Sequence, residues 1–112
     1  MQTVVETPSY LSDIQALFSP AERVAIVARL ASEPTCGVLI PGCHGLRKVR
    51  FGFGGRGKRS GARIIYLFGG TDIPVFLIAA FAKNEKADLT MAERNALGTM
   101  VADMLAKYRR GR

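Results

Sequence analysis

The stretch 46-LRKVRFGFGGRGKRSGARIIYLF-68 holds two strand-like runs on either side of a basic, glycine-rich segment. In the first run, Leu46–Phe53, apolar and basic residues alternate, which predicts a strand with one apolar and one basic face. The apolar face comprises Val49, Phe51 and Phe53, and the basic face comprises Lys48 and Arg50. The second run, Arg63–Phe68, is rich in Ile and aromatic residues and also predicts a strand. The short connection 54–61 favours antiparallel pairing of the two strands.

The segment 52-GFGGRGKRS-60 nearly matches a phosphate-binding P-loop, which requires Gly, four residues, Gly, Lys and then Ser or Thr. Gly57 and Lys58 fit this pattern, but Arg59 stands where the hydroxyl should be. A P-loop also needs a helix directly after it, because helix N-terminal amides bind the phosphates, whereas residues 61–68 are strand-like. We therefore interpret the segment as a hairpin loop whose glycines supply positive φ angles and whose cations bind phosphate.

Helix-start signals flank this region. Thr7-Pro8 and the capping box Ser19–Glu22 predict two consecutive helices that form a hairpin, and the second helix ends before Pro34. A short strand at Val4-Val5 precedes them, and the glycine-rich stretch Cys36–Gly45 predicts a loop.

The C-terminal part begins with Val75–Phe81, a continuous apolar run that predicts a central strand covered on both faces. A turn at Gly69–Asp72 precedes it, and the capping box Thr90–Glu93 starts a last helix. The apolar stripe of that helix comprises Leu97, Met100, Val101, Met104, Leu105 and Tyr108. The predicted order is βααβββα, an α+β fold with a small antiparallel sheet of about four strands, two N-terminal helices and a C-terminal helix.

The composition predicts one domain, residues 1–112, that binds a polyanion. The formal net charge is +7, which favours nucleic acid, ribosome or an acidic protein as partner. Residues 41–70 contain seven basic residues and no acid. These basic residues are Arg47, Lys48, Arg50, Arg56, Lys58, Arg59 and Arg63. Residues 107–112 add a basic tail with Arg109, Arg110 and Arg112, which we expect to fray.

The chain lacks the patterns of a secreted, membrane-bound or metal-binding protein. Its N-terminus has neither a basic stretch nor an apolar core of a signal peptide, and the apolar run Ile73–Ala82 is shorter than the roughly 20 residues of a membrane span. We therefore expect a cytoplasmic protein. Cys36 and Cys43, with His44 beside the second, do not complete a zinc site, so we expect two reduced thiols, no metal and no other cofactor.

Two segments carry a family resemblance: 44-HGLRKVRFGFGGRGKRSGARIIYLF-68 and 75-VFLIAAFAKNEKADLTMAERNAL-97. Their Gly-Leu-Arg-Lys-x-Arg, Gly-Lys-x-x-Gly-x-Arg-x-x-Tyr and Ala-Lys-Asn-Glu-Lys-x-Asp-Leu motifs resemble RelE/HigB-type toxins of bacterial type II toxin–antitoxin systems, closest to the HigB-like branch of the RelE/ParE superfamily. The resemblance spans nearly the whole chain. It implies a ribosome-dependent mRNA endoribonuclease that inhibits translation, in which the 2′-hydroxyl attacks the adjacent phosphate without a metal.

The resemblance also implies the site. Its catalytic residues are Lys48, Arg50, Arg63 and Lys83, since preorganised cations stabilise a phosphorane-like transition state. Its RNA-binding residues are Arg47, Arg56, Lys58, Arg59 and Lys86. Many relatives carry an arginine and a late tyrosine where this chain has Asn84 and Thr90, so the proton-transfer group stays open among Lys48, Lys83 and His44. Two plainer readings also stay open: Lys48 and Arg50 as a solvated strand face, and Arg63 as the partner of an acid such as Asp88.

The implied partners are a cognate antitoxin of helix-turn-helix type, mRNA and the ribosomal decoding site, with operator DNA reached only through the antitoxin and no membrane. Two other functions remain open from the residues. One is a ParE-like inhibitor of DNA gyrase, which shares the fold. The other is an RNA- or ribosome-binding module without catalytic activity.

Overall fold

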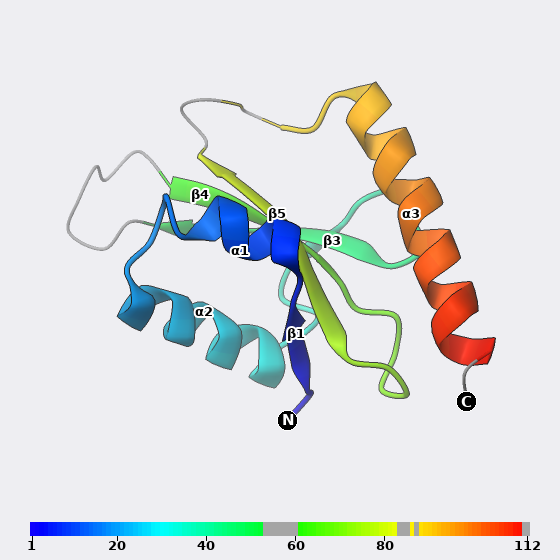
Figure 1. Ribbon diagram of the computed structural model, residues 1–112, viewed down its shortest axis with the longest axis horizontal. Coiled ribbons are helices and arrows are strands. Elements are labelled where there is room, and N and C mark those ends of the chain that lie inside the picture. The colour runs from blue at the N-terminus through cyan, green and yellow to red at the C-terminus, as the bar shows by residue number, and fades with distance from the viewer. Residues whose placement is uncertain (53–60, 83–85, 87, 111–112) are drawn as a thin grey trace.

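The computed structural model describes residues 1–52, 61–82, 86 and 88–110. These residues form an α+β fold with one mixed sheet of five strands in the order β1-β5-β4-β3-β2 (Figure 1). The elements in chain order are β1 (Val4–Glu6), α1 (Pro8–Ile14), α2 (Pro20–Ser32), β2 (Val38–Leu39), β3 (Leu46–Gly52), β4 (Gly61–Leu67), β5 (Val75–Ala82) and α3 (Met91–Arg110). No helix in the described part of the chain combines the length and apolarity needed to cross a bilayer.

The central part of the sheet has the predicted pairing, and its edges do not. β3 pairs antiparallel with β4, and β4 with β5, as short connections require. The expectation of a purely antiparallel sheet was wrong, because β1 pairs parallel with β5 in the register Val4↔Val75. The strand count was also too low, because Val38 and Leu39 pair with Lys48 and Arg47 as an edge strand inside the expected loop. The observed order is therefore βααββββα.

The predicted caps start the helices where expected. The Thr7 side chain accepts from the Tyr10 amide at α1, and a complete capping box of Ser19 and Glu22 opens α2. α2 ends at Ser32, before Pro34, as predicted. α1 ends at Ile14, and the chain then turns towards α2.

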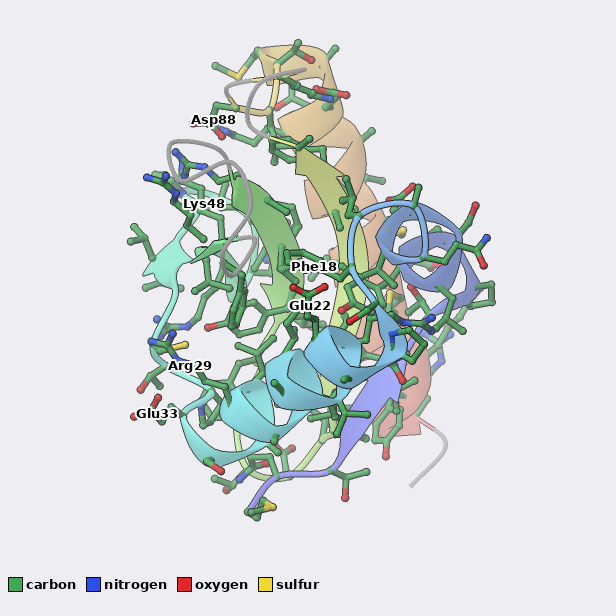
Figure 2. The ribbon with its side chains drawn as sticks, turned by 90° about the vertical axis from the view of Figure 1, so that its left-hand side faces the viewer. Phe18, Glu22, Arg29, Glu33, Lys48 and Asp88 are labelled. Atoms are coloured by element: carbon green, nitrogen blue, oxygen red, sulfur yellow. The ribbon has the colours of Figure 1, made fainter. Side chains whose placement is uncertain are left out.

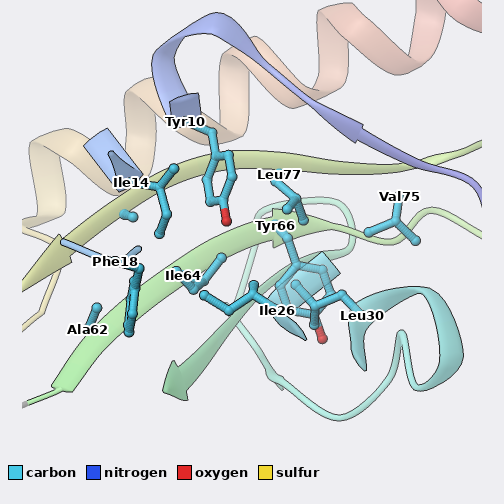
Figure 3. Packing of buried hydrophobic residues seen from close by; sticks show 11 residues of the cluster. Tyr10, Ile14, Phe18, Ile26, Leu30, Ala62, Ile64, Tyr66, Val75 and Leu77 are labelled. Atoms are coloured by element: carbon cyan, nitrogen blue, oxygen red, sulfur yellow. The ribbon is translucent and has the colours of Figure 1, made fainter. Parts of the chain in front are cut away.

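The helices cover opposite faces of the sheet, with α1 and α2 on one side and α3 on the other (Figure 1). Beneath α1 and α2 lies a continuous apolar cluster, the first core (Figure 3). Its buried members are Tyr10, Ile14, Phe18, Ile26, Leu30, Ala62, Ile64, Tyr66, Val75, Leu77 and Ala80. The two N-terminal helices thus pack their apolar faces against the sheet, as expected for amphipathic helices that cover a sheet.

The second core lies between the sheet and α3. Its buried members are Ile40, Cys43, Leu46, Ile65, Leu67, Ile78 and Val101. α3 itself buries only Gly98 and Val101 fully. Most of the predicted stripe packs here, but Met100 is 38% exposed, and Tyr108 meets Phe76 edge to face with ring centroids 6.1 Å apart. α3 is therefore held along a narrow line of contacts.

β5 is the central strand that its continuous apolar run predicted. Leu77 belongs to the first core and Ile78 to the second. The pairing with β4 shifts register between Ile65 and Tyr66, which is the signature of a bulge. The Ser9 hydroxyl donates to the Ile78 carbonyl at 2.8 Å, so the start of α1 is tied to the strand at this irregularity.

Candidate nucleic-acid interface

Three cations occupy the α3 side of the two central hairpin strands. Arg50 is the direct Cα partner of Arg63, and Lys48 is the partner of Ile65, a buried member of the second core. Side chains that stand opposite each other in an antiparallel pair project from the same face. Lys48, Arg50 and Arg63 therefore share one face, as the alternation of the sequence predicted, and we call them the cation row.

The cation row places like charges directly opposite each other. Such cross-strand pairs are destabilising unless an anion or a neighbouring acid compensates them. Arg63 Nε is buried and has no hydrogen-bond partner among the residues that the structure describes. A buried donor without an acceptor costs about 1–3 kcal/mol. A phosphate bound by the guanidinium groups of the cation row would neutralise part of their charge.

Gly61 gives Arg50 the room to lie across β4. A Cβ atom at Gly61 would come within 2.7 Å of the Phe51 carbonyl oxygen and 3.2 Å of Arg50 Nε. The first distance is shorter than real Cβ contacts, so a side chain at this position would displace the strand backbone. Gly61 was expected in the connection 54–61, but it is the first residue of β4 and pairs with Gly52, and its lack of a side chain lets the Arg50 guanidinium lie close to β4.

Lys48 is paired with Asp88, in the segment that leads into α3 (Figure 2). Lys48 Nζ donates to Asp88 Oδ2 at 2.7 Å, and Asp88 Oδ1 accepts the Leu89 amide at 2.8 Å. The hydrogen bond from Lys48 lowers the pKa of Asp88, with smaller contributions from the Leu89 amide and the charge of Arg63. Asp88 therefore stays ionised at neutral pH and holds the β5–α3 connection against the cation row. The residue considered as a partner for Arg63 instead binds Lys48.

Arg47 does not join the cation row. Its Cα partner in β4 is Tyr66, which belongs to the first core, so Arg47 lies on the opposite face. Its Nη1 donates to the Gly37 carbonyl at 2.7 Å and to the Thr35 carbonyl at 3.3 Å. Neighbouring residues of a strand point to opposite faces. The expectation that Arg47 binds RNA beside Lys48 therefore has no support in this arrangement, and Arg47 instead holds the segment before β2.

Lys86 lies beside the cation row but has partners of its own. Its Nζ forms an ion pair with Glu93 and sits 5.3 Å from the centroid of the Phe81 ring. Phe81 is the Cα partner of Arg63 in β5. Lys86 thus extends the positive charge toward the start of α3. The hydrogen bond from Lys86 also lowers the pKa of Glu93.

His44, the third candidate for proton transfer, lies apart from these cations. It precedes β3, whereas Arg50 is near the other end of that strand. It is exposed and has a φ of 56°, a left-handed conformation that places it in the turn before β3. It lines a hollow against α3 together with Arg94. The structure therefore associates His44 with α3 and not with Arg50 and Arg63.

Several predicted residues lie outside the described part of the chain. These are the catalytic candidate Lys83, the loop cations Arg56, Lys58 and Arg59, and the end of the basic tail, Arg112. The start of that tail is helical, because α3 continues to Arg110. Arg109 Nη2 donates to the Gly69 carbonyl at 3.2 Å, so this part of the tail is anchored.

Two residues that matter to the site were missed or undervalued from the sequence. Asp88 is the acid of the Ala-Lys-Asn-Glu-Lys-x-Asp-Leu motif, and its position there was the available signal for a role beside Lys48. For Arg94, nothing in the sequence except its charge indicated a place beside His44. Among residues that the structure describes, no three His, Cys, Asp or Glu side chains converge as metal ligands. The chain matches no model of a known protein family, so only the geometry of these residues identifies the candidate site.

Proposed function

We propose that the protein is a RelE/HigB-type toxin of a type II toxin–antitoxin system, acting in the cytoplasm as a ribosome-dependent mRNA endoribonuclease. The observation that carries the proposal is the cation row: Lys48, Arg50 and Arg63 project from one face of two paired strands. Arg63 Nε is buried there without a hydrogen-bond partner among the described residues. Three donors on one face of a hairpin suit the binding of an anion such as a phosphate.

The reaction that fits this arrangement is transfer of a phosphodiester within RNA. The 2′-oxygen forms a bond to the adjacent phosphorus, the bond from phosphorus to the 5′-oxygen breaks, and the products are a 2′,3′-cyclic phosphate and a 5′-hydroxyl. The 2′-hydroxyl gives its proton to water, and the leaving 5′-oxygen takes one from the Lys48 ammonium group, which water then reprotonates. Arg50 and Arg63 bind the non-bridging oxygens, where negative charge grows in the transition state.

Lys48 is the residue of the row best suited to the leaving oxygen, because an ammonium group both neutralises charge and donates a proton. Its present partner, Asp88, occupies a position that a phosphate oxygen competes for. RNA binding therefore exchanges one oxygen ligand of Lys48 for another. The partners in this proposal are mRNA in the decoding site and an antitoxin of helix-turn-helix type that covers the cation row.

The test is to express the chain without an antitoxin and to map new mRNA 5′ ends, comparing Arg63→Ala with the unchanged protein. We expect translation-dependent cleavage that Arg63→Ala lowers by about 10²–10³-fold, since losing one transition-state donor has this effect. The matched control is Arg29→Ala on α2, where Arg29 is 48% exposed and pairs with Glu33. That variant should cleave normally.

The other outcomes identify the competing functions. Growth arrest with intact mRNA and reduced DNA supercoiling would indicate a gyrase inhibitor. Absence of arrest, combined with RNA binding that weakens with salt, would indicate a binding module without catalysis. Equal loss of cleavage in Arg63→Ala and Arg29→Ala would contradict a specific role for the cation row.

A further inference from the structure

A hollow of about 760 Å³ lies on the α3 side of the molecule, between the turn before β3 and one face of α3. It is lined by Pro41, Gly42, Cys43, His44, Met91, Arg94, Asn95, Gly98, Thr99 and Ala102. The described residues that line it include two basic side chains, His44 and Arg94, and no acid. Sites for small organic ligands occupy roughly 300–1,000 Å³, so the hollow has the size of a nucleotide site.

The walls of the hollow are held together by direct contacts. Cys43 Sγ donates to the Arg94 carbonyl at 3.6 Å. A Cβ at Gly98 would touch Cys43 Sγ and the Gly42 carbonyl oxygen, both at 3.6 Å, so the turn rests against the helix backbone. Arg94 Nε is buried and has no hydrogen-bond partner in the part of the chain that the structure describes. This donor suits an oxygen ligand.

The hollow is close to the Lys48 end of the cation row along both of its walls. His44 precedes Lys48 by four residues, which extended chain spans in at most about 13 Å. On the other wall, Asp88 binds Lys48 and precedes Met91 by three residues, at most about 10 Å of chain. A strand of RNA at the cation row therefore reaches the hollow within a few nucleotides.

We propose that this hollow is a second RNA subsite, which binds a nucleotide flanking the one cleaved at the cation row; this inference rests on the proposed ribonuclease function. Arg94 and His44 bind the phosphate. Pro41 and Met91 give an apolar surface for the base, since pockets for unstacked bases are lined by aromatic or apolar side chains. The Asn95 amide and the Thr99 hydroxyl are the groups that hydrogen-bond a base edge.

The experiment measures binding of single-stranded RNA to the full chain by fluorescence anisotropy at several salt concentrations. It uses an oligonucleotide of about eight nucleotides, a length typical of single-strand sites, and a dinucleotide as the short probe. The variants are Arg94→Ala and Thr99→Glu, the second of which keeps Arg94 and adds an opposing charge. The matched control is Ala96→Glu, an exposed position of α3 that does not line the hollow.

We expect Arg94→Ala and Thr99→Glu each to weaken binding of the longer RNA by about tenfold, the usual effect of losing one nucleotide contact. Both should leave dinucleotide binding unchanged. For Arg94→Ala the slope of log affinity against log salt should also fall by about 0.7, the value for one phosphate contact on a single strand. Ala96→Glu should weaken binding much less than Thr99→Glu, and melting temperatures show that all variants are folded.

The outcomes separate the subsite from the proposed function. If the longer RNA binds through Lys48 and Arg63 but is indifferent to Arg94→Ala and Thr99→Glu, the subsite is wrong and the ribonuclease proposal stands. If Ala96→Glu weakens binding as much as Thr99→Glu, the effect is general charge and the subsite is also wrong. If no free RNA binds, the subsite is wrong, whereas the proposed function, which requires the ribosome, fails only if the mapped mRNA ends show no cleavage that depends on Arg63.

Discussion

The two faces of the sheet are covered in different ways, and the difference separates stability from function. On one face α1 and α2 close the first core, which contains Phe18 and Ala62 close to the end of the central hairpin. On the other face α3 buries only Gly98 and Val101, and the second core borders the cation row, since its buried member Ile65 is the Cα partner of Lys48. The same strands thus carry an apolar side covered by two helices and a side on which the cation row lies beside a smaller core.

The largest effect on stability is expected at the neighbours Ile64 and Ile65, which test this comparison directly. Both are fully buried, Ile64 in the first core and Ile65 in the second. Replacing a buried Ile by Ala costs about 2–5 kcal/mol, depending on how far the surroundings collapse into the cavity. We expect Ile64→Ala near the upper end, under two helices, and Ile65→Ala near the lower end, because the sparsely anchored α3 can move inward. Urea unfolding of the two variants measures both values. Equal costs would mean that α3 packs as firmly as α1 and α2.

A second test concerns the hydroxyl of Tyr66 in the first core. It donates to the Pro34 carbonyl and accepts the Gly37 amide, both at 2.8 Å. Tyr66→Phe leaves the buried Gly37 amide without its acceptor, which should cost about 1–3 kcal/mol in unfolding free energy. Chemical denaturation at neutral pH gives the value.

The same residue predicts a pH dependence. Burial raises the pKa of Tyr66 to about 12 from its ordinary 10.0. Because the folded protein holds this proton more tightly, the stabilisation is complete below pH 10 and is lost as the pH rises towards 12. The advantage of the unchanged protein over Tyr66→Phe should therefore shrink in this range. Burial also raises the pKa of Tyr10, so Tyr66→Phe should still lose some stability at alkaline pH.

A third test compares the matched capping boxes on the two faces, Ser19 at α2 and Thr90 at α3. In each, the side-chain oxygen of the cap residue accepts a hydrogen bond from the amide three residues later. The carboxylate of that later residue, Glu22 or Glu93, accepts a hydrogen bond from the amide of the cap residue. Loss of a cap costs about 1 kcal/mol. We expect Ser19→Ala to lower global stability, and Thr90→Ala to increase hydrogen exchange mainly within α3. A purely global effect of Thr90→Ala would contradict the loose anchoring of that helix.

The smallest expected effect is that of Asp88→Asn on stability. The Lys48–Asp88 pair is partly exposed, so its loss should cost about 0.2–1 kcal/mol at neutral pH. Because the pKa of Asp88 is lowered in the fold, this contribution is present above its ordinary value of 3.8 and disappears as the pH falls through the lowered value. Unfolding curves between neutral and acidic pH should therefore converge for the two proteins. If the difference in unfolding free energy between the two proteins grew in acid, the ion pair between Lys48 and Asp88 would not be its source.

Local patterns predicted a good part of the fold because they depend on backbone and side-chain geometry close in sequence. Capping side chains fixed the starts of α1 and α2, and alternation placed Lys48 and Arg50 on one face. Patterns of this kind carry no information about edges. β2 has only Val38 and Leu39, both exposed, so neither alternation nor burial marked it in a glycine-rich stretch.

The candidate site divides in the same way. The sequence itself determined that a basic hairpin face lies opposite an apolar one, because a strand repeats every two residues and its cations must share a side. The tertiary structure alone decided that Arg47 binds the Thr35 and Gly37 carbonyls, that Asp88 binds Lys48 and that Arg94 meets the turn at His44. These contacts join segments far apart in the chain. The first depends on where the chain between α2 and β2 lies, and the other two depend on how α3 packs across the sheet; no local preference specifies either arrangement.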